Sequence, residues 1–199
     1  MSTLRLFAIA LSPLLLLASA CGPSQPPLSE GPISDSAIGG PFELVDSKGE
    51  TVRWEDFKGK WRIVYFGYAY CPDVCPFDVQ RMMRGYDGFK EQQPELAAQL
   101  QPIFITVDPG RDTPEVVGEF TSAFSDDLLG LTGTAEQVDA AAKAFSVYYA
   151  KGEVSEGGGY MMDHSRAAYL MGREGEPIAL LPVESSAEEV TATLLKWVR

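Results

Sequence analysis

Residues 62–89 read RIVYFGYAYCPDVCPFDVQRMMRGYDGF, and this stretch indicates the fold class. Its first part, Arg62 to Phe66, is a β-branched and aromatic run that is typical of a buried central strand. After the two cysteines, apolar residues recur at helical spacing, at Val79, Met82, Tyr86 and Phe89. We expect a helix that begins at Pro76. Both thiols are therefore predicted just beyond the carboxyl end of a strand.

The segments on either side continue the alternation of strands and helices. Further strands are expected at residues 103–107 and 129–131, each followed by a helix with an N-cap threonine, Thr113 or Thr134. Residues 167–171 and 178–181 predict a hairpin before a helix capped by Ser186, and residues 42–45 and 51–54 predict an opening hairpin. The predicted fold class is α/β: a thioredoxin-like mixed sheet flanked by helices, with an added N-terminal β-hairpin.

The N-terminus has the pattern of a bacterial lipoprotein signal peptide, residues 1–20. Arg5 precedes an apolar run that ends in small residues before Cys21. The run is shorter than the roughly 20 residues that span a membrane. Lipidated Cys21 is expected to begin the mature chain, followed by a flexible linker over residues 21–40 and one domain over residues 41–199. The prediction is a periplasm-side, membrane-anchored lipoprotein of a bacterium; a plain secreted protein is the alternative.

Charge and cysteine content narrow the function classes. The formal net charge is −12, which argues against nucleic-acid binding because phosphate contacts need clustered Lys and Arg. With Cys21 lipidated, only Cys71 and Cys75 remain as thiols among the three cysteines. Export to an oxidising compartment would allow these two to form a disulfide.

Cys71 and Cys75 stand four positions apart in CPDVCP. Because Pro76 disfavours helical geometry at the preceding residue, Cys75 is expected to mark the helix entrance, where the helix dipole favours thiolate. Two thiolates at this spacing suit one soft metal ion or a redox disulfide. A static structural disulfide is the competing interpretation.

His164 is the only histidine of the chain and the only imidazole available as a third ligand. Thiolate and imidazole together suit Cu(I), Cu(II) or Zn(II), although a lone histidine is more often structural. Asp163 is a candidate partner that orients His164, or it caps a turn. Asp108 is a second supporting candidate; the simpler interpretation is that Asp108, Arg111 and Asp112 form a loop cap and an ion pair of Arg111 with a carboxylate, ahead of the helix at Thr113. The adjacent methionines, Met161 and Met162, offer thioethers, or simply pack.

Three separate blocks resemble the signature blocks of the Sco/SenC family, in the family order. They are FGYAYCPDVCP at 66–76, VDPGRDTP at 107–114 and MDHS at 162–165. The resemblance implies a thioredoxin-like fold that binds one copper ion, Cu(I) or Cu(II), through Cys71, Cys75 and His164. It also implies partners: the copper-bearing subunit of cytochrome c oxidase, whose binuclear copper centre is being assembled, or another copper carrier. Many relatives have Thr-His where this chain has Ala69 and Tyr70, but that histidine is not a family ligand.

Two functions remain open at this point. A metallochaperone would need no catalytic base and would not be an enzyme. A thiol-disulfide oxidoreductase would use Cys71 and Cys75 as the redox pair and keep partner cysteines reduced. No proline immediately precedes Ala167, where thioredoxin-type enzymes usually carry a cis-proline, and this favours the copper hypothesis. A peroxidase is disfavoured because Tyr68 occupies the place of its threonine.

Overall fold

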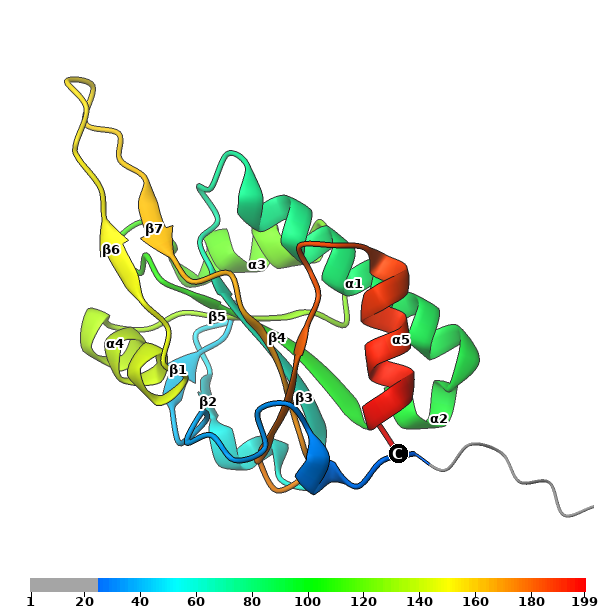
Figure 1. Ribbon diagram of the computed structural model, residues 1–199. Coiled ribbons are helices and arrows are strands. Elements are labelled where there is room, and N and C mark those ends of the chain that lie inside the picture. The colour runs from blue at the N-terminus through cyan, green and yellow to red at the C-terminus, as the bar shows by residue number, and fades with distance from the viewer. Residues whose placement is uncertain (1–24) are drawn as a thin grey trace, which may run out of the picture.

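The computed structural model describes residues 25–199, in which a five-stranded mixed sheet forms the centre (Figure 1). The strand order is β5-β4-β3-β8-β9. The first three are parallel, whereas β8 runs antiparallel to β3 and to β9. Their bounds are β3 Trp61–Gly67, β4 Leu100–Thr106, β5 Leu129–Leu131, β8 Ala168–Met171 and β9 Pro177–Leu181. The predicted mixed, thioredoxin-like sheet is confirmed.

Helices cover both faces of this sheet. In Figure 1, α1 and α5 lie side by side on one face, and α4 lies on the other. Right-handed crossovers explain the arrangement, because β3-α1-β4 and β4-α3-β5 advance in the same direction and so place α1 and α3 on the same face. The helices are α1 Val74–Gln92, α2 Pro94–Ala97, α3 Pro114–Ser122, α4 Ala135–Ala144 and α5 Ala187–Trp197.

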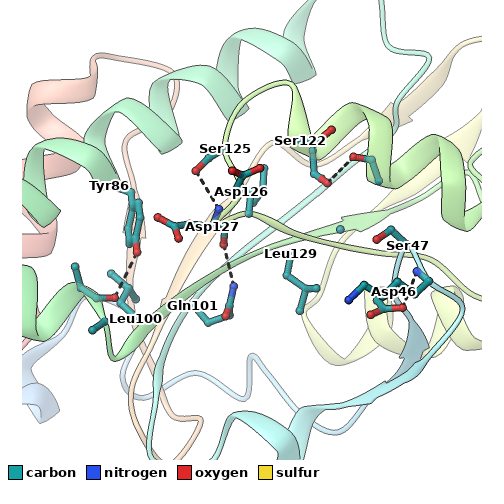
Figure 2. Close-up of a pocket in the computed structure, with 17 residues that line it drawn as sticks. Asp46, Ser47, Tyr86, Leu100, Gln101, Ser122, Ser125, Asp126, Asp127 and Leu129 are labelled. Atoms are coloured by element: carbon teal, nitrogen blue, oxygen red, sulfur yellow. Dashed lines mark hydrogen bonds between the residues drawn. The ribbon is translucent and has the colours of Figure 1, made fainter.

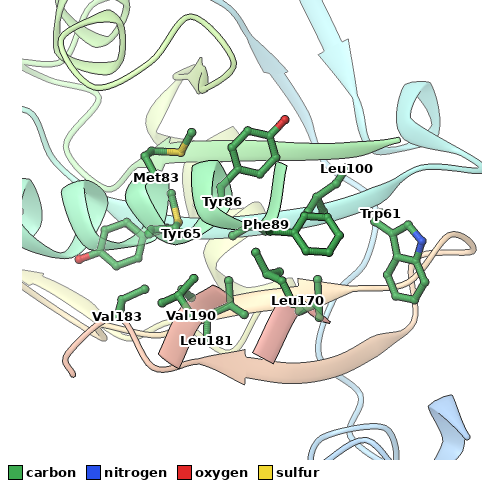
Figure 3. Close-up of a cluster of buried hydrophobic side chains, with 14 of the residues drawn as sticks. Trp61, Tyr65, Met83, Tyr86, Phe89, Leu100, Leu170, Leu181, Val183 and Val190 are labelled. Atoms are coloured by element: carbon green, nitrogen blue, oxygen red, sulfur yellow. The ribbon is translucent and has the colours of Figure 1, made fainter. Parts of the chain in front are cut away.

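The core on the α1 face is built from side chains of α1, α5 and the sheet (Figure 3). Tyr65 of β3, Phe89 of α1 and Val190 of α5 are all almost completely buried there. The two helices approach closely at Gly85, where an added Cβ would lie 2.4 Å from a methyl carbon of Val190. This packing fixes the orientation of α1, which carries Cys75 at its first turn.

The predicted N-terminal hairpin is present as β1 Glu43–Val45 and β2 Thr51–Arg53, in a two-stranded sheet of its own. An isolated bridge between Val45 and Thr132 links it to the end of β5. Leu44 is fully buried in the core on the α4 face. The hairpin therefore covers the second face together with α4.

A second small sheet was not predicted. It pairs β6 Tyr149–Lys151 with β7 Met162–His164, and the hairpin projects away from the central sheet (Figure 1). His164 is directly opposite Tyr149 in this pairing. Both strands have only three residues, which is too short for alternation to be recognised in the sequence. His164 is the last residue of β7.

The predicted start of α1 was wrong by two residues. The helix begins at Val74, with Asp73 as N-cap, so Cys75 and Pro76 both lie in its first turn. Proline is tolerated there because the first N–H groups of a helix have no partner within the helix. Cys75 therefore has helical backbone geometry.

Part of the predicted linker packs against the domain. Residues 28–30 form a short 3-10 helix, and Leu28 packs against the core on the α1 face. The Ile33 N–H donates a 3.3 Å hydrogen bond to the Ile178 carbonyl of β9. The folded part of the chain therefore begins before residue 41. The signal peptide and Cys21 lie outside the described residues, and within residues 25–199 no helix is long and apolar enough to cross a membrane.

Candidate metal and redox site

The two cysteines meet where β3 ends and α1 begins. Cys71 lies in the connecting loop and is 7% exposed, while Cys75 in the first turn of α1 is completely buried. The backbone N–H of Cys75 donates to the Cys71 sulfur at 3.4 Å. Both cysteines are free thiols in this structure. The pair is thus adjacent and able to serve either a metal or a redox reaction.

His164 completes the group that the sequence predicted. Its Nε2 lies 3.2 Å from the Cys75 sulfur, and its Nδ1 lies 2.8 Å from the Ser165 carbonyl oxygen. A carbonyl oxygen only accepts, so Nδ1 carries a hydrogen that it donates to Ser165, and in a neutral ring the lone pair is then on Nε2. This is the tautomer that a metal ligand needs.

The carbonyl of Ser165, not Asp163, orients the histidine ring. The Asp163 side chain is exposed, and among the described residues it makes no hydrogen bond to His164. In β7 its side chain points to the opposite face from its neighbour His164, since successive residues of a strand alternate. Of the two roles considered for Asp163, the orienting contact with His164 is made by the Ser165 carbonyl in this structure.

Two tyrosines enclose the imidazole. The rings of Tyr65 and Tyr68 stand edge-on to His164, with centroids 6.4 and 5.9 Å away. The Tyr68 hydroxyl lies near the Cys71 sulfur and 3.9 Å from the Met161 sulfur. Burial raises the pKa of Tyr68 to about 12, so it stays a neutral donor. Met161 is half-exposed beside the site, whereas Met162 packs in the core.

The two thiols differ in pKa: Cys71 loses its proton more readily than Cys75 does. A hydrogen bond from the Cys75 thiol lowers the pKa of Cys71 to about 5, against the opposing effect of burial, with help from backbone N–H groups and Tyr68. The same hydrogen bond, together with burial, raises the pKa of Cys75 strongly. At neutral pH the pair is a Cys71 thiolate next to a Cys75 thiol. Metal binding by both sulfurs would release the remaining proton.

Asp112, in the sequence block at 107–114, is hydrogen-bonded to the loop that leads to Cys71. Buried Asp112 accepts hydrogen bonds from the Ala69 N–H at 2.8 Å and from Thr106 Oγ1 at 2.6 Å. Burial raises the pKa of this carboxyl. Asp108 instead binds Arg111 and the Tyr160 hydroxyl. Asp108 therefore contacts the loop between β6 and β7 through Tyr160, and it makes no hydrogen bond to any of the three candidate ligands.

Two thiols and an imidazole are suitable ligands for a soft metal ion, but in this structure the three side chains do not yet surround a common position. Within residues 25–199 no three His, Cys, Asp or Glu side chains are positioned to hold an ion together. Cys75 contacts both Cys71 and His164. An ion bound by all three requires the Cys71 side chain to adjust, which its loop position permits.

The sequence analysis did not identify Asp78 and Arg166, which connect the helix of Cys75 to the segment of His164. Asp78 is fully buried on α1, and Arg166 donates two hydrogen bonds to its carboxylate. A signal was present: Asp78 precedes Met82 by four positions and so falls on the apolar face of the predicted helix. An acidic residue in a buried stripe needs a partner.

A cavity of about 460 Å³ lies elsewhere, along the edge strand β5 and the start of β4 (Figure 2). None of the three candidate ligands lines it. Its polar groups are engaged in local turns: Ser125 Oγ accepts from the Asp127 N–H, and Gln101 donates to the Asp127 carbonyl. This cavity offers no chemistry related to the thiols.

Comparison with known proteins identifies the family. The profile described as SCO1/SenC matches residues 30–199. The chain belongs to the SCO1/SenC family. SenC of Rhodobacter capsulatus is 44% identical over 138 residues, covering 69% of this chain and 60% of that protein. The human mitochondrial SCO1 homolog is 36% identical over 167 residues, covering 84% of this chain and 55% of that protein. The chain thus spans little more than half the length of these SCO1/SenC relatives.

A solved SCO1/SenC structure has the same fold. Arabidopsis thaliana ScoI, crystallised with copper bound, superposes with a TM-score of 0.75 and 36% identity, over 80% of this chain and 97% of that one. Copper-bound ScoI from Bradyrhizobium japonicum gives a TM-score of 0.72 and 34% identity. The thioredoxin-like fold and the resemblance expected from the sequence are both confirmed.

Proposed function

We propose that this protein is a copper metallochaperone that holds one copper ion through Cys71, Cys75 and His164. The observation that carries the proposal is the 3.2 Å approach of His164 Nε2 to the buried Cys75 sulfur, with the Cys71 thiolate beside it. Two soft sulfurs and an imidazole suit Cu(I) and Cu(II). The copper-bound ScoI relatives support copper as the cargo.

The arrangement suits a cargo that must leave again. Cys71 belongs to a loop at the protein surface, while Cys75 and the Ser165-oriented His164 are held by regular structure. A partner's ligand can displace the Cys71 thiolate first, because Cys71 keeps slight exposure to solvent whereas Cys75 has none. Cys75 and His164 retain the ion until transfer is complete.

The proposed recipient is the copper-bearing subunit of cytochrome c oxidase, or another copper carrier, during assembly of the binuclear copper centre. The membership in the SCO1/SenC family supports this. The proposed location is the periplasmic side of a bacterial membrane, through a lipid on Cys21. A membrane location would bring the site close to a membrane-bound recipient.

Metal analysis of the reduced protein tests the proposal. The protein without residues 1–21 is loaded with copper under reducing conditions and desalted, and the metal content is measured. We expect about one copper per chain, and little in His164→Ala when loaded as Cu(II). Absence of copper from the reduced wild-type protein would contradict the metallochaperone function.

A thiol-disulfide oxidoreductase is the second candidate, and the lowered pKa of Cys71 favours it. A thiolate at neutral pH can attack a partner's disulfide sulfur, and Cys75 can then resolve the mixed disulfide and release the partner's thiol. Two thiols of this protein become one disulfide as the partner's disulfide becomes two thiols. Rapid exchange with a model disulfide, without copper binding, would favour this function.

A further inference from the structure

The proposed ligands come from two parts of the fold that share no strand pairing. Cys71 and Cys75 follow β3 of the central sheet, whereas His164 belongs to the separate β6-β7 sheet. The residues between β7 and β8 connect the two sheets. Strand pairing with Tyr149 fixes His164 within its own hairpin but not relative to the cysteines. Another contact must set the distance between His164 and Cys75.

That contact is made by Asp78 and Arg166. Arg166 is two residues beyond His164, and its Nε and Nη2 donate to the two carboxylate oxygens of Asp78 at 2.9 and 2.8 Å. Asp78 is one helical turn beyond Cys75 and is completely buried. Bidentate pairing of a guanidinium with a carboxylate fixes orientation as well as distance. The pair therefore connects the helix of Cys75 to the segment of His164.

Neighbouring groups reinforce the connection. The Tyr65 hydroxyl donates to Asp78 Oδ2 at 3.1 Å, and the same tyrosine ring stands edge-on to His164. Between His164 and Arg166, the Ser165 N–H donates to the Tyr148 carbonyl at 2.9 Å. The short segment thus has little freedom, and a displacement of Arg166 is transmitted to His164.

We propose that Asp78 and Arg166 are positioning residues of the copper site, which hold His164 at ligand distance from Cys75. The inference rests on the proposed copper function and assigns to these residues a role in the affinity for Cu(II). Cu(II) depends more on the imidazole than Cu(I) does, because two thiolates suffice to hold Cu(I). Loosening the pair should therefore resemble a partial loss of His164.

The test variant is Arg166→Lys, which keeps the charge but loses the bidentate geometry. Arg166 is 34% exposed in its side chain, so the substitution does not bury a new group. We expect Cu(II) affinity to fall about 10- to 100-fold, the usual cost of losing a group that orients a ligand. Cu(I) affinity should change less than about threefold. The nitrogen hyperfine splitting in the Cu(II) electron paramagnetic resonance spectrum should weaken.

Arg81→Lys is the matched control. Arg81 also approaches Asp78, at 3.7 Å, but it belongs to α1; its hydrogen bond goes to the Val183 carbonyl, and within residues 25–199 it has no hydrogen bond or ion pair with the segment that carries His164. This control should leave both copper affinities and the spectrum unchanged. Arg166→Gln is measured in parallel, so that a folding defect in one variant leaves another for comparison, and thermal unfolding is recorded for each.

The outcomes separate this inference from the proposed function. If His164→Ala weakens Cu(II) binding but the folded Arg166 variants bind Cu(II) like wild type, the positioning role is overturned while the copper site stands. If wild-type protein binds no copper, the proposed function itself fails. If the Arg166 variants lose Cu(I) and Cu(II) equally, the pair only stabilises the fold, and the positioning role is overturned.

Discussion

Cys75 connects the other two proposed ligands. Its thiol donates to Cys71, its sulfur lies 3.2 Å from His164 Nε2, and its side chain is fully buried. Cys71 differs, because it carries the thiolate and lies in a loop. The two cysteines therefore differ in protonation and in burial, although each is followed by proline in the CPDVCP motif.

Cys71→Ser and Cys75→Ser should each reduce copper affinity by more than about 100-fold, beyond the cost of losing an orienting group. Each substitution removes one of two soft sulfurs from a three-donor site. Competition with a chromophoric Cu(I) chelator measures the effect. Met162→Leu, which replaces a sulfur packed in the core, is the control. Wild-type affinity in either serine variant would rule out a shared site.

The lowered pKa of Cys71 predicts an unusual pH dependence of alkylation. In the reduced, metal-free protein, reaction with iodoacetamide should persist as pH falls and decline with a midpoint near the pKa of about 5. Unfolded protein should decline near pH 8.5, the ordinary thiol value. Because a hydrogen bond from Cys75 is the main cause, removing that thiol in Cys75→Ala should move the midpoint upward. A folded-state midpoint near 8.5 would contradict the assigned thiolate.

At the scale of elements, α1 links the core to the site. Its first turn contains Cys75, its second carries Asp78, and its later turns pack against α5 and the sheet (Figure 3). The β6-β7 hairpin supplies His164 from the other side. The geometry of the site therefore depends on how these two elements are held, and α5 fixes the first of them.

Gly85→Ala should destabilise the fold through the contact between α1 and α5. The new Cβ would lie within 2.5 Å of two Val190 carbons and 2.9 Å from the Ala187 carbonyl oxygen. Overpacking costs about 1–3 kcal/mol, against roughly 1 kcal/mol gained in helix propensity. Urea unfolding should show a lower midpoint, partly restored in Gly85→Ala/Val190→Ala. A variant as stable as wild type would show that the helices separate easily.

At the scale of the whole molecule, the site lies at one end of an acidic domain. The chain carries a formal net charge of −12, and the cysteine loop and the β6-β7 hairpin form the same end in Figure 1. Several of the exposed large apolar side chains, such as Tyr70, Phe77 and Met161, belong to this region. The end that carries the proposed ligands is thus also the end with exposed apolar side chains.

Cys21→Ser should release the protein from the membrane fraction if the predicted lipoprotein signal operates. Serine at this position lacks the thiol to which the lipid is attached. Fractionation of cells and mass spectrometry of the mature chain check this, with Cys71→Ser as the control that keeps the anchor. Unchanged membrane retention together with an unchanged mass would exclude lipidation of Cys21.

The sequence alone determined the central strand, the helix after the cysteines, the fold class and the three candidate ligands. The strand and the helix follow from the β-branched and aromatic run at 62–66 and the helical spacing from Val79 onward, and the candidate ligands from two cysteines, a unique histidine and the resemblance to the Sco/SenC blocks. The helix start was predicted at Pro76 because proline destabilises the interior of a helix. In the first turn proline is tolerated, and the helix begins two residues earlier, at Val74. Tertiary structure alone decided that Ser165 rather than Asp163 orients His164, and that Arg166 binds Asp78. Asp163 points away from the His164 side because side chains alternate along β7, a strand of only three residues. Arg166 and Asp78 are 88 positions apart in the sequence, and only the fold brings them together. No local pattern encodes such distances, since they result from packing two sheets and a helix together.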